Sequence, residues 1–335
     1  MNEILWFVLA VVAGLVVLVW SADRFVAGAA GLARVMGIST LIIGLTIVAF
    51  GTSAPEMLVS AMAALQGNSG LAIGNAVGSN IANMALVLGV TALIAPLAVQ
   101  SKTLSREFPL MLIVMLAAWA LLWNGQLSRL DGTLLLAGMF GVVLWTIHLA
   151  RTTGTDDPLI EELAEEIPES MPKGRAWWLL LSGLTLLLAS SKLLVWGAVG
   201  IAQFYGVSDL VIGLTIVAIG TSLPELAASV TAARKQEHDI AVGNVVGSNL
   251  FNILAVLGIA GSIGPSEVDS AVLYRDFPLM LVLAVALYIM ARGFSRSGHG
   301  LIKRWAGAIL LLVFLAYQSS LFLTVVGGPA TPAGL

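Results

Sequence analysis

The chain has 335 residues, of which 59% are hydrophobic and only 10% are charged. Soluble domains carry about 25% charged residues, so this composition excludes a soluble protein and predicts several membrane spans. The formal net charge of −3 argues against a nucleic-acid-binding protein, which would need a basic face. The absence of cysteine excludes disulfides, thiolate metal sites and cysteine nucleophiles.

Ten apolar segments follow one another along the chain, and a helix needs about 20 apolar residues to cross a bilayer. An α-helix satisfies its own backbone groups in lipid, and the segments lack the short alternating pattern of a membrane β-barrel. We therefore expect an all-α polytopic membrane protein. The first segment lacks the basic start and the cleavage site of a signal peptide, so we expect a span, which residues 23–37 could extend. The ten expected spans are 4–22, 38–65, 71–95, 108–123, 132–150, 176–200, 208–233, 240–263, 277–291 and 304–325.

Threading ten spans through a membrane puts 13 of the 16 basic residues into the connections on one side. Because cytoplasmic connections are enriched in Lys and Arg, we expect both termini outside and the connection at 151–174 in the cytoplasm. This connection carries seven acidic residues and three prolines. It lacks the ligand spacing of an EF-hand, so a solvated tether is favoured over a Ca²⁺-sensing loop.

An internal duplication relates the two halves of the chain at a constant offset of 169 residues. Across 44–89 and 213–258, 25 of 46 positions are identical without a gap. The matches include Pro, Glu, Ser and Asn, which chance similarity between apolar helices would not align. Each half holds five spans, an odd number, so the second half enters the membrane from the opposite side. We predict two inverted five-helix repeats, residues 1–150 and 175–335, joined by an acidic linker at 151–174.

Two glutamates lie inside expected spans, each directly after a proline, whereas most other charges lie at span ends. They are Glu56 and Glu225, at equivalent positions in the two repeats. A charge at the bilayer centre costs roughly 2.5–3.5 kcal/mol on the insertion scale, and no Lys or Arg lies nearby in these helices. A hydrogen bond between two neutral carboxylic acids is the simplest alternative, but it needs fewer oxygen-bearing neighbours than the sequence supplies. A bound cation is the favoured compensation.

Neutral oxygen-bearing side chains accompany both glutamates. Hydroxyls stand three and four residues before each glutamate and so share its helix face, and the proline bends the helix and loosens backbone carbonyls. In the following span, a serine and an asparagine four residues apart present a second oxygen-bearing face, beside glycines that permit close helix approach. These side chains are Thr52, Ser53, Ser79 and Asn83 in the first repeat, and Thr221, Ser222, Ser248 and Asn252 in the second.

Every candidate ligand in this set is an oxygen atom, which hard cations prefer. Ca²⁺ takes about 6–8 oxygens in flexible geometry, whereas Mg²⁺ demands a near-ideal octahedron. The lack of cysteine and the peripheral placement of the three histidines argue against zinc or copper. Two carboxylates would neutralise one Ca²⁺, and Na⁺ ions or protons could neutralise them equally, which is the charge logic of an exchanger.

At these residues the sequence resembles the sodium/calcium exchanger family of the cation/calcium antiporter superfamily, in its prokaryotic form. The likeness rests on GTSAPE at 51–56 with GNAVGSNIAN at 74–83, and on GTSLPE at 220–225 with GNVVGSNLFN at 243–252. It implies Na⁺/Ca²⁺ exchange by alternating access in a bacterial or archaeal inner membrane. Asn252 stands where many relatives have aspartate, which weakens any case for K⁺ co-transport. The resemblance implies as ion ligands Glu56, Thr52, Ser53, Ser79, Asn83, Glu225, Thr221, Ser222, Ser248, Asn252 and the backbone carbonyls of Ala49 and Ala218.

The function expected from the sequence is a Na⁺/Ca²⁺ antiporter, with a Ca²⁺/H⁺ antiporter on the same scaffold as the alternative. An intramembrane hydrolase using Ser53 or Ser222 would need a nearby His or Lys base, which these spans lack, so no enzyme activity is expected. A passive channel is also disfavoured, because it would need a ring of subunits or a continuous pore, whereas the duplicated residues indicate one closed two-fold site. The expected substrates are Ca²⁺ and Na⁺, and the chain is expected to act as a monomer in a lipid bilayer, without a cofactor or nucleic acid.

Overall fold

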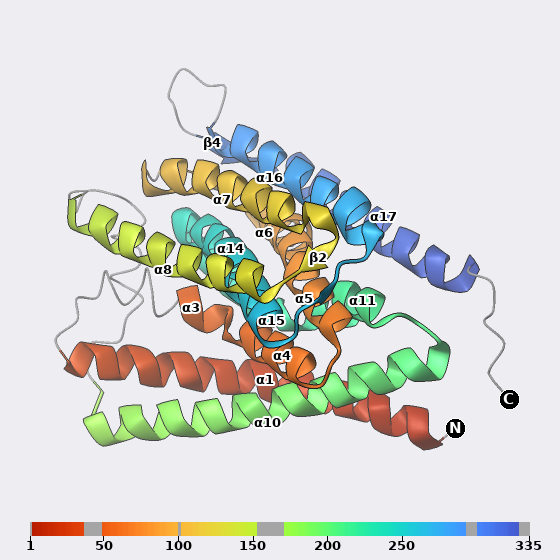
Figure 1. Ribbon diagram of the computed structural model, residues 1–335. Coiled ribbons are helices and arrows are strands. Elements are labelled where there is room, and N and C mark those ends of the chain that lie inside the picture. The colour runs from red at the N-terminus through yellow and green to blue at the C-terminus, as the bar shows by residue number, and fades with distance from the viewer. Residues whose placement is uncertain (1, 37–48, 100–101, 153–170, 293–299, 328–335) are drawn as a thin grey trace, which may run out of the picture.

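Helices form nearly all of the computed structural model, as the sequence predicts (Figure 1). Within the described residues, nine helices are long and apolar enough to cross a membrane. The second expected span, 38–65, is described only from Ala49 onward, where it forms two short helices. The fold is therefore that of an all-α polytopic membrane protein. The structure describes residues 2–36, 49–99, 102–152, 171–292 and 300–327.

The first repeat opens with one long helix, because the polar residues after position 22 do not interrupt it and residues 23–35 continue its path. Its second span is broken into two pieces close to the proline. The helices of this repeat are α1 (Asn2–Val35), α3 (Ala49–Thr52), α4 (Ala54–Leu65), α5 (Ser69–Ala82), the π-helix η2 (Asn83–Val87), α6 (Leu88–Ile94), α7 (Lys102–Leu121), the 3₁₀ helix η3 (Leu122–Asn124) and α8 (Arg129–Thr152).

The second repeat follows the same plan, again with a long first helix and a broken second span. Most of the linker expected at 151–174 lies outside the described residues, between the end of α8 and the start of the next helix. The helices are α10 (Lys173–Tyr205), α11 (Asp209–Ile212), η4 (Gly213–Val217), α12 (Ala218–Thr221), α13 (Leu223–Lys235), α14 (His238–Phe251), η5 (Asn252–Val256), α15 (Leu257–Ile263), η6 (Val272–Asp276), α16 (Phe277–Arg292) and α17 (Arg304–Gly327).

Four very short strands, which the sequence does not predict, join the two repeats. β1 (Leu97–Val99) pairs antiparallel with β4 (Gly300–Ile302), and β2 (Gln126–Leu127) pairs antiparallel with β3 (Ser266–Glu267). In the chain, α7 runs from β1 to β2, whereas its equivalent α16 runs from β3 to β4. Equivalent helices therefore run in opposite directions between the same two strand pairs, which confirms that the repeats are inverted.

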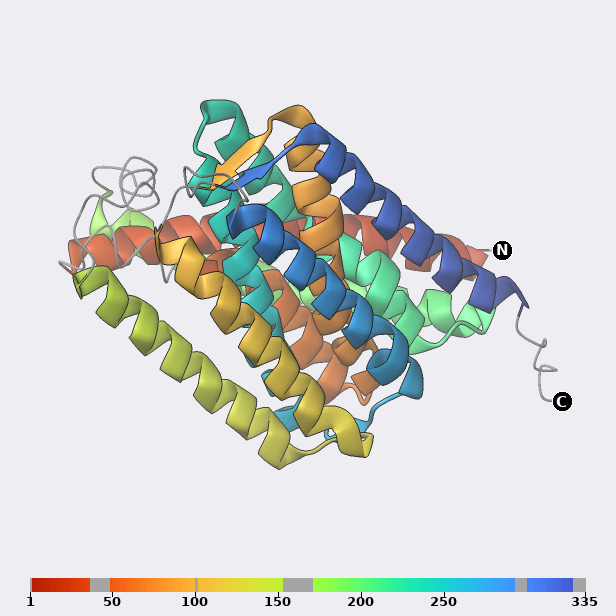
Figure 2. The same ribbon diagram turned by 90° about the horizontal axis from the view of Figure 1, so that it is seen from above.

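The first helices of the two repeats, α1 and α10, lie side by side and antiparallel along one edge of the bundle (Figure 1). Glycines make this contact close: Gly14 packs against the backbone of Leu194, and Gly28 against that of Leu180. At about 1.5 Å per residue a helix of this length spans roughly 50 Å, more than the roughly 30 Å of hydrocarbon. Helices α7, α16 and α17 lie on the other side of the core (Figures 1 and 2).

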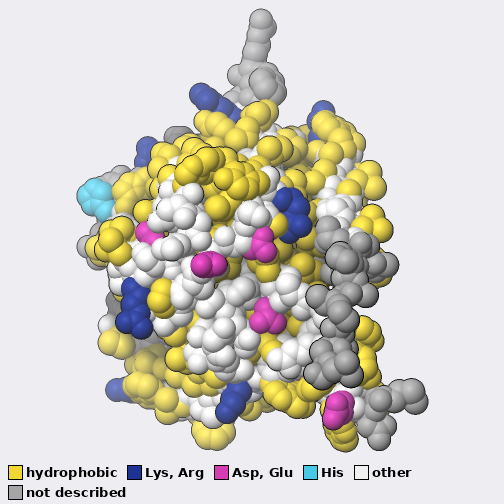
Figure 3. All heavy atoms as spheres, turned by 45° about the vertical axis from the view of Figure 1, so that its right-hand side comes forward, with side chains coloured by type: hydrophobic (Ala, Val, Ile, Leu, Met, Phe, Trp, Pro, Cys, Tyr) yellow, Lys and Arg dark blue, Asp and Glu magenta, His cyan; other side chains and the backbone are white. Residues whose placement is uncertain are grey.

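The centre of the bundle is formed by α5 and its equivalent α14, whose side chains are mostly buried. The outside is apolar as well: large hydrophobic side chains such as Trp6, Ile113, Leu144 and Trp178 are exposed, and hydrophobic atoms cover broad areas of the face in Figure 3. An apolar exterior suits contact with lipid. Most polar side chains of α5 and α14 are instead buried inside the bundle.

Candidate cation site

The second span of each repeat breaks at a serine that belongs to the predicted site. Ser53 separates α3 from α4 with φ −86° and ψ 1°, and Ser222 separates α12 from α13 with φ −83° and ψ 4°. A proline stands in the first turn after each break, where its missing N–H leaves a helix carbonyl without its usual donor. The sequence predicts a bend caused by each proline, and the observed break lies two residues before it.

Hydroxyl groups from the two repeats meet between the broken spans and the central helices. Thr52 Oγ1 lies 3.4 Å from Ser248 Oγ, and Thr221 Oγ1 lies 3.4 Å from Ser79 Oγ. Each pair joins a broken span of one repeat to the central helix of the other. The structure therefore brings together four predicted residues that are 142 and 196 positions apart in the chain.

The two glutamates are fully buried, with no solvent-exposed surface. Glu225 Oε1 accepts a hydrogen bond from Ser248 Oγ at 3.2 Å. Among the described residues, Glu225 Oε2 and both carboxylate oxygens of Glu56 have no hydrogen-bond partner, and neither glutamate forms an ion pair. A buried polar atom without a partner costs free energy, and a buried charge costs more, so ionised glutamates at these positions would need a proton or a cation to compensate them.

Other predicted ligands share this unpartnered state. Ser53 and Ser222 are buried, and their hydroxyl oxygens have no hydrogen-bond partner within the described part of the chain. The same holds for both side-chain amide atoms of Asn83 and Asn252. Each of these asparagines is the first residue of a π-helix, and π-helical turns inside α-helices are frequent at functional sites. The sequence gives no sign of these turns.

The predicted backbone ligands lie in the short helices before the breaks. Ala49 is the first residue of α3. The Ala218 carbonyl accepts hydrogen bonds from Ser222 N at 3.1 Å and from Thr221 Oγ1 at 3.4 Å. In this conformation the Ala218 carbonyl therefore accepts a regular helical hydrogen bond. Binding of a cation by its oxygen would use the lone pair that this hydrogen bond leaves free.

Two asparagines that the sequence analysis did not single out lie among these groups. Asn75 Oδ1 accepts from Thr221 Oγ1 at 3.1 Å, and Asn244 Oδ1 accepts from Thr52 Oγ1 at 3.4 Å. Both belong to the duplicated Gly-Asn pairs at 74–75 and 243–244. Their exact recurrence at the offset of 169 was the available signal, because two polar amides are retained at equivalent buried positions of both repeats.

Glycines allow the two repeats to approach closely at this site. A side chain at Gly74 would lie 2.5 Å from the Leu210 carbonyl, and one at Gly78 would lie 2.8 Å from the Ala218 side chain. Both positions therefore need a residue without a Cβ, as the small-residue spacing predicts for them. This contact places α5 of the first repeat directly against η4 and α12 of the second.

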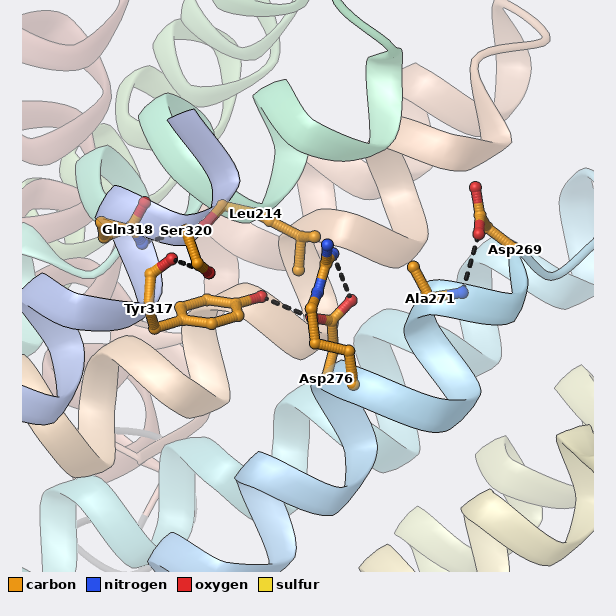
Figure 4. A network of polar contacts seen from close by, with 8 residues as sticks. Leu214, Asp269, Ala271, Asp276, Tyr317, Gln318 and Ser320 are labelled. Atoms are coloured by element: carbon orange, nitrogen blue, oxygen red, sulfur yellow. Dashed lines mark hydrogen bonds and ion pairs between the residues drawn. The ribbon is translucent and has the colours of Figure 1, made fainter. Parts of the chain in front are cut away.

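A different buried carboxylate, Asp276 at the end of η6, has all the partners that the glutamates lack (Figure 4). Arg275 Nε and Nη2 lie 2.7 and 3.1 Å from its two oxygens, and the Tyr317 hydroxyl donates to it at 2.8 Å. Next to Tyr317, Gln318 Nε2 donates to the Leu214 carbonyl of η4 at 3.3 Å. The sequence places Asp276 at a span end, but it is fully buried and ties α17 to η6.

Within the described residues there is no group of three or more His, Asp or Glu side chains that could hold a metal ion. The predicted ligands are instead two carboxylates and a larger number of neutral oxygens, drawn equally from the two repeats. Such a donor set fits a hard cation such as Ca²⁺ or Na⁺.

Comparison with known proteins decides the family. A family model described as sodium/calcium exchanger protein matches residues 6–148 and 175–323. This chain belongs to the sodium/calcium exchanger family. It is 50% identical to CaxA of Alkalimonas amylolytica over 93% of this chain and 97% of that protein. It is 33% identical to the sodium/calcium exchanger MaX1 of Methanosarcina acetivorans, over 92% and 96% respectively.

A solved structure of another exchanger shares the fold. The sodium-calcium exchanger NCX_Mj, from crystals soaked with Na⁺ and Sr²⁺, superposes with a TM-score of 0.65 at 32% identity, covering 95% of this chain and 99% of that one. The family resemblance inferred from the GTSAPE and GTSLPE motifs is thus confirmed. Membership of the sodium/calcium exchanger family makes the chain a multi-pass membrane protein and supports antiport as its activity.

Proposed function

We propose that this chain is a secondary antiporter that exchanges Na⁺ for Ca²⁺ through one site formed by both repeats. The observation that carries the proposal is the set of buried oxygens without partners around Glu56 and Glu225. Relatives support the choice of ions, because MaX1 is named a sodium/calcium exchanger and NCX_Mj was soaked with Na⁺ and Sr²⁺. The proposed ligands are the twelve groups that the resemblance implies.

Charge explains why the two ions compete for the site. Two carboxylates carry two negative charges, which one Ca²⁺ or two Na⁺ ions would neutralise. In a low-dielectric interior two unpaired charges repel each other strongly, so the empty site is costly and the filled site is not. Ions of one kind therefore leave when ions of the other kind replace them, which is the condition for exchange.

The inverted repeats supply a route for alternating access. Equivalent elements approach the site from opposite sides of the membrane, so a rearrangement that opens one repeat has a counterpart in the other. We propose that α1, α10 and the broken spans rearrange to expose the same ions to each face in turn. Serine does not act as a nucleophile in this proposal, and the chain needs neither a cofactor nor an enzyme activity.

Orientation in the membrane follows from the basic residues. The excess of Lys and Arg on one side favours both termini outside and the 151–174 linker in the cytoplasm of a bacterial or archaeal cell. Cysteine added at the described N-terminal end of α1, in a chain that has no native cysteine, would be labelled from outside by an impermeant maleimide. Labelling only after permeabilisation would contradict this orientation.

Gradient-driven uptake into proteoliposomes tests the proposed exchange. Vesicles loaded with Na⁺ and diluted into Na⁺-free buffer are expected to accumulate ⁴⁵Ca²⁺, and vesicles with equal Na⁺ on both sides are not. A monensin-treated sample, in which the Na⁺ gradient is dissipated, is the control. Uptake driven by a pH gradient and indifferent to Na⁺ would replace the proposal with a Ca²⁺/H⁺ antiporter, in which the glutamates carry protons.

A further inference from the structure

Asn75 connects the predicted ligands of one repeat to the backbone of the other. Its amide nitrogen donates to the Glu56 carbonyl at 3.2 Å and to Ser60 Oγ at 3.0 Å. Ser60 Oγ in turn donates to the Ala72 carbonyl at 3.3 Å. The amide oxygen of Asn75 accepts from Thr221 Oγ1 at 3.1 Å, and from Ser79 Oγ at 3.4 Å. The first chain of hydrogen bonds thus runs from Thr221 through Asn75 and Ser60 to Ala72.

The second repeat contains the same chain. Asn244 Nδ2 donates to the Glu225 carbonyl at 3.3 Å and to Ser229 Oγ at 3.1 Å. Ser229 Oγ donates to the Ala241 carbonyl at 3.2 Å, and Thr52 Oγ1 donates to Asn244 Oδ1 at 3.4 Å. All four members of this second chain lie at the offset of 169 from the first. Each chain starts at a hydroxyl of one repeat and ends in the backbone of the other.

The direction of each chain is fixed by its backbone end. The Glu56 carbonyl can only accept a hydrogen bond, so the amide atom of Asn75 that faces it is the nitrogen. The Ser60 hydroxyl has one proton, which goes to the Ala72 carbonyl, so Ser60 accepts from the same nitrogen. The oxygen of the Asn75 amide therefore faces Thr221. The Thr221 proton has a second acceptor within reach, the Ala218 carbonyl at 3.4 Å, and the shorter distance of 3.1 Å favours the Asn75 oxygen.

We propose that Asn75 and Asn244 are positioning residues that turn the hydroxyl protons of Thr221 and Thr52 away from the transported cation. A hydroxyl has one proton and two lone pairs, and it binds a cation only when its lone pairs face the ion. An amide oxygen that takes the proton leaves those lone pairs directed into the site. Groups that orient ligands in this way typically change metal affinity by about 10–100-fold when they are removed. This inference rests on the proposed function.

A double-mutant cycle in equilibrium ⁴⁵Ca²⁺ binding, with the purified full-length chain in detergent, tests the proposal. Asn75→Ala removes the proton acceptor, and Thr221→Val removes the hydroxyl while keeping the shape of the side chain. Each single variant is expected to raise the Kd for Ca²⁺ by about 10-fold or more. If Asn75 acts through Thr221, the double variant binds no more weakly than Thr221→Val alone.

Asn80 supplies the matched control. It lies on the same helix and is equally buried, but its amide nitrogen donates to the Ala76 carbonyl one turn earlier. Asn80→Ala combined with Thr221→Val should give effects on Kd that multiply. Multiplying effects for the Asn75 pair, or coupling as strong for the Asn80 pair, would overturn the proposal, because Asn75 would then act through packing or through Ser79 and not through Thr221.

A milder variant keeps the test decisive if Asn75→Ala does not fold, as judged by size-exclusion chromatography. Ser60→Ala removes only the next link, and its effect on Kd should likewise vanish in the Thr221→Val background. The binding assay does not depend on the coupling ion, so Ca²⁺/H⁺ exchange in the uptake assay would change the proposed function and leave this inference standing. A chain that binds no ⁴⁵Ca²⁺ would overturn both.

Discussion

Two regions of this membrane domain hold buried carboxylates, and they treat them in opposite ways. Asp276 is neutralised by Arg275 and receives the Tyr317 hydroxyl, so its charge and lone pairs are satisfied within the protein. Glu56 and Glu225 are equally buried, yet among the described residues no cation faces them and three of their four oxygens have no partner. The difference separates a carboxylate with a permanent counter-charge from two carboxylates that the proposed function assigns to the transported ion.

The comparison also shows why burial alone does not identify a site. Asp276, Glu56 and Glu225 have the same exposed fraction, 0%. What distinguishes them is the permanent counter-charge beside Asp276, which offsets much of the cost of removing a carboxylate from water. Substitutions that remove one charge at a time should therefore affect transport in one region and stability in the other.

The largest expected effect is on transport, from Glu56→Gln or Glu225→Gln. Either change removes one of the two charges that attract the ion, and we expect Na⁺-driven ⁴⁵Ca²⁺ uptake to fall by about 100-fold or more. Thermal unfolding of the ion-free protein should be unchanged or occur at higher temperature, because an uncompensated buried charge is gone. Full uptake by either variant would refute the site.

Asp276→Asn should produce the opposite pattern. It leaves Arg275 without its counter-charge, and breaking a buried pair costs about 3–5 kcal/mol. Because the Arg275 side chain is 32% exposed, we expect a smaller loss of about 2 kcal/mol in the free energy of unfolding, measured by SDS titration in mixed micelles. The Kd for Ca²⁺ should stay within about threefold of the wild type. A loss of binding without a loss of stability would erase the distinction between the regions.

Tyr317→Phe sharpens the comparison further, because it removes one hydrogen bond to Asp276 and no charge. Hydrogen bonds between helices in membranes contribute about 0.6–2 kcal/mol, so a destabilisation of about 1 kcal/mol is expected in the same titration. Tyr288→Phe is the matched control, since the Tyr288 hydroxyl accepts from Arg292 at an exposed position. Equal losses of stability in the two variants would show that the burial of Asp276 does not strengthen the hydrogen bond from Tyr317.

The smallest effect is expected from Gln318→Leu. Its hydrogen bond to the Leu214 carbonyl, at 3.3 Å, involves no charge, so the loss should be about 0.5 kcal/mol or less. A loss larger than that of Tyr317→Phe would mean that the attachment of α17 to η4, and not the neutralisation of Asp276, dominates this region. The two variants should be measured side by side.

Much of the fold follows from the sequence because hydrophobic length and duplication are long-range signals. Five spans in each half require inversion, and the opposite directions of α7 and α16 between the same strand pairs confirm it. The π-turns at Asn83 and Asn252 could not be predicted, because they add one residue to a helix without altering its composition. The extension of α1 to Val35 was foreseen only as an option, since Asp23 and Arg24 resemble the end of a span.

The candidate site was predictable where identical polar residues recur, and less so where the role of a residue depends on one particular hydrogen-bond partner. The meeting of Thr52 with Ser248 and of Thr221 with Ser79 follows from inversion. Asn75 recurs as faithfully, but its role depends on hydrogen bonds to the other repeat, which no spacing reveals. The burial and the hydrogen bonding of Asp276 could not be predicted either, because its partner Tyr317 lies 41 residues away on another helix.

The strand pairs β1–β4 and β2–β3 restrict how this molecule can move. They connect the two repeats by backbone hydrogen bonds at both ends of α7. A hinge motion that separates the repeats would therefore break the hydrogen bonds of one strand pair. The long helices α1 and α10 carry no strand in the described part of the chain, and glycines bring them into close contact, with Phe7 against Gly200 and Phe25 against Gly183. Under the proposed alternating access, α1 and α10 are therefore the long helices expected to move, while the strand pairs hold the remaining helices of the two repeats together.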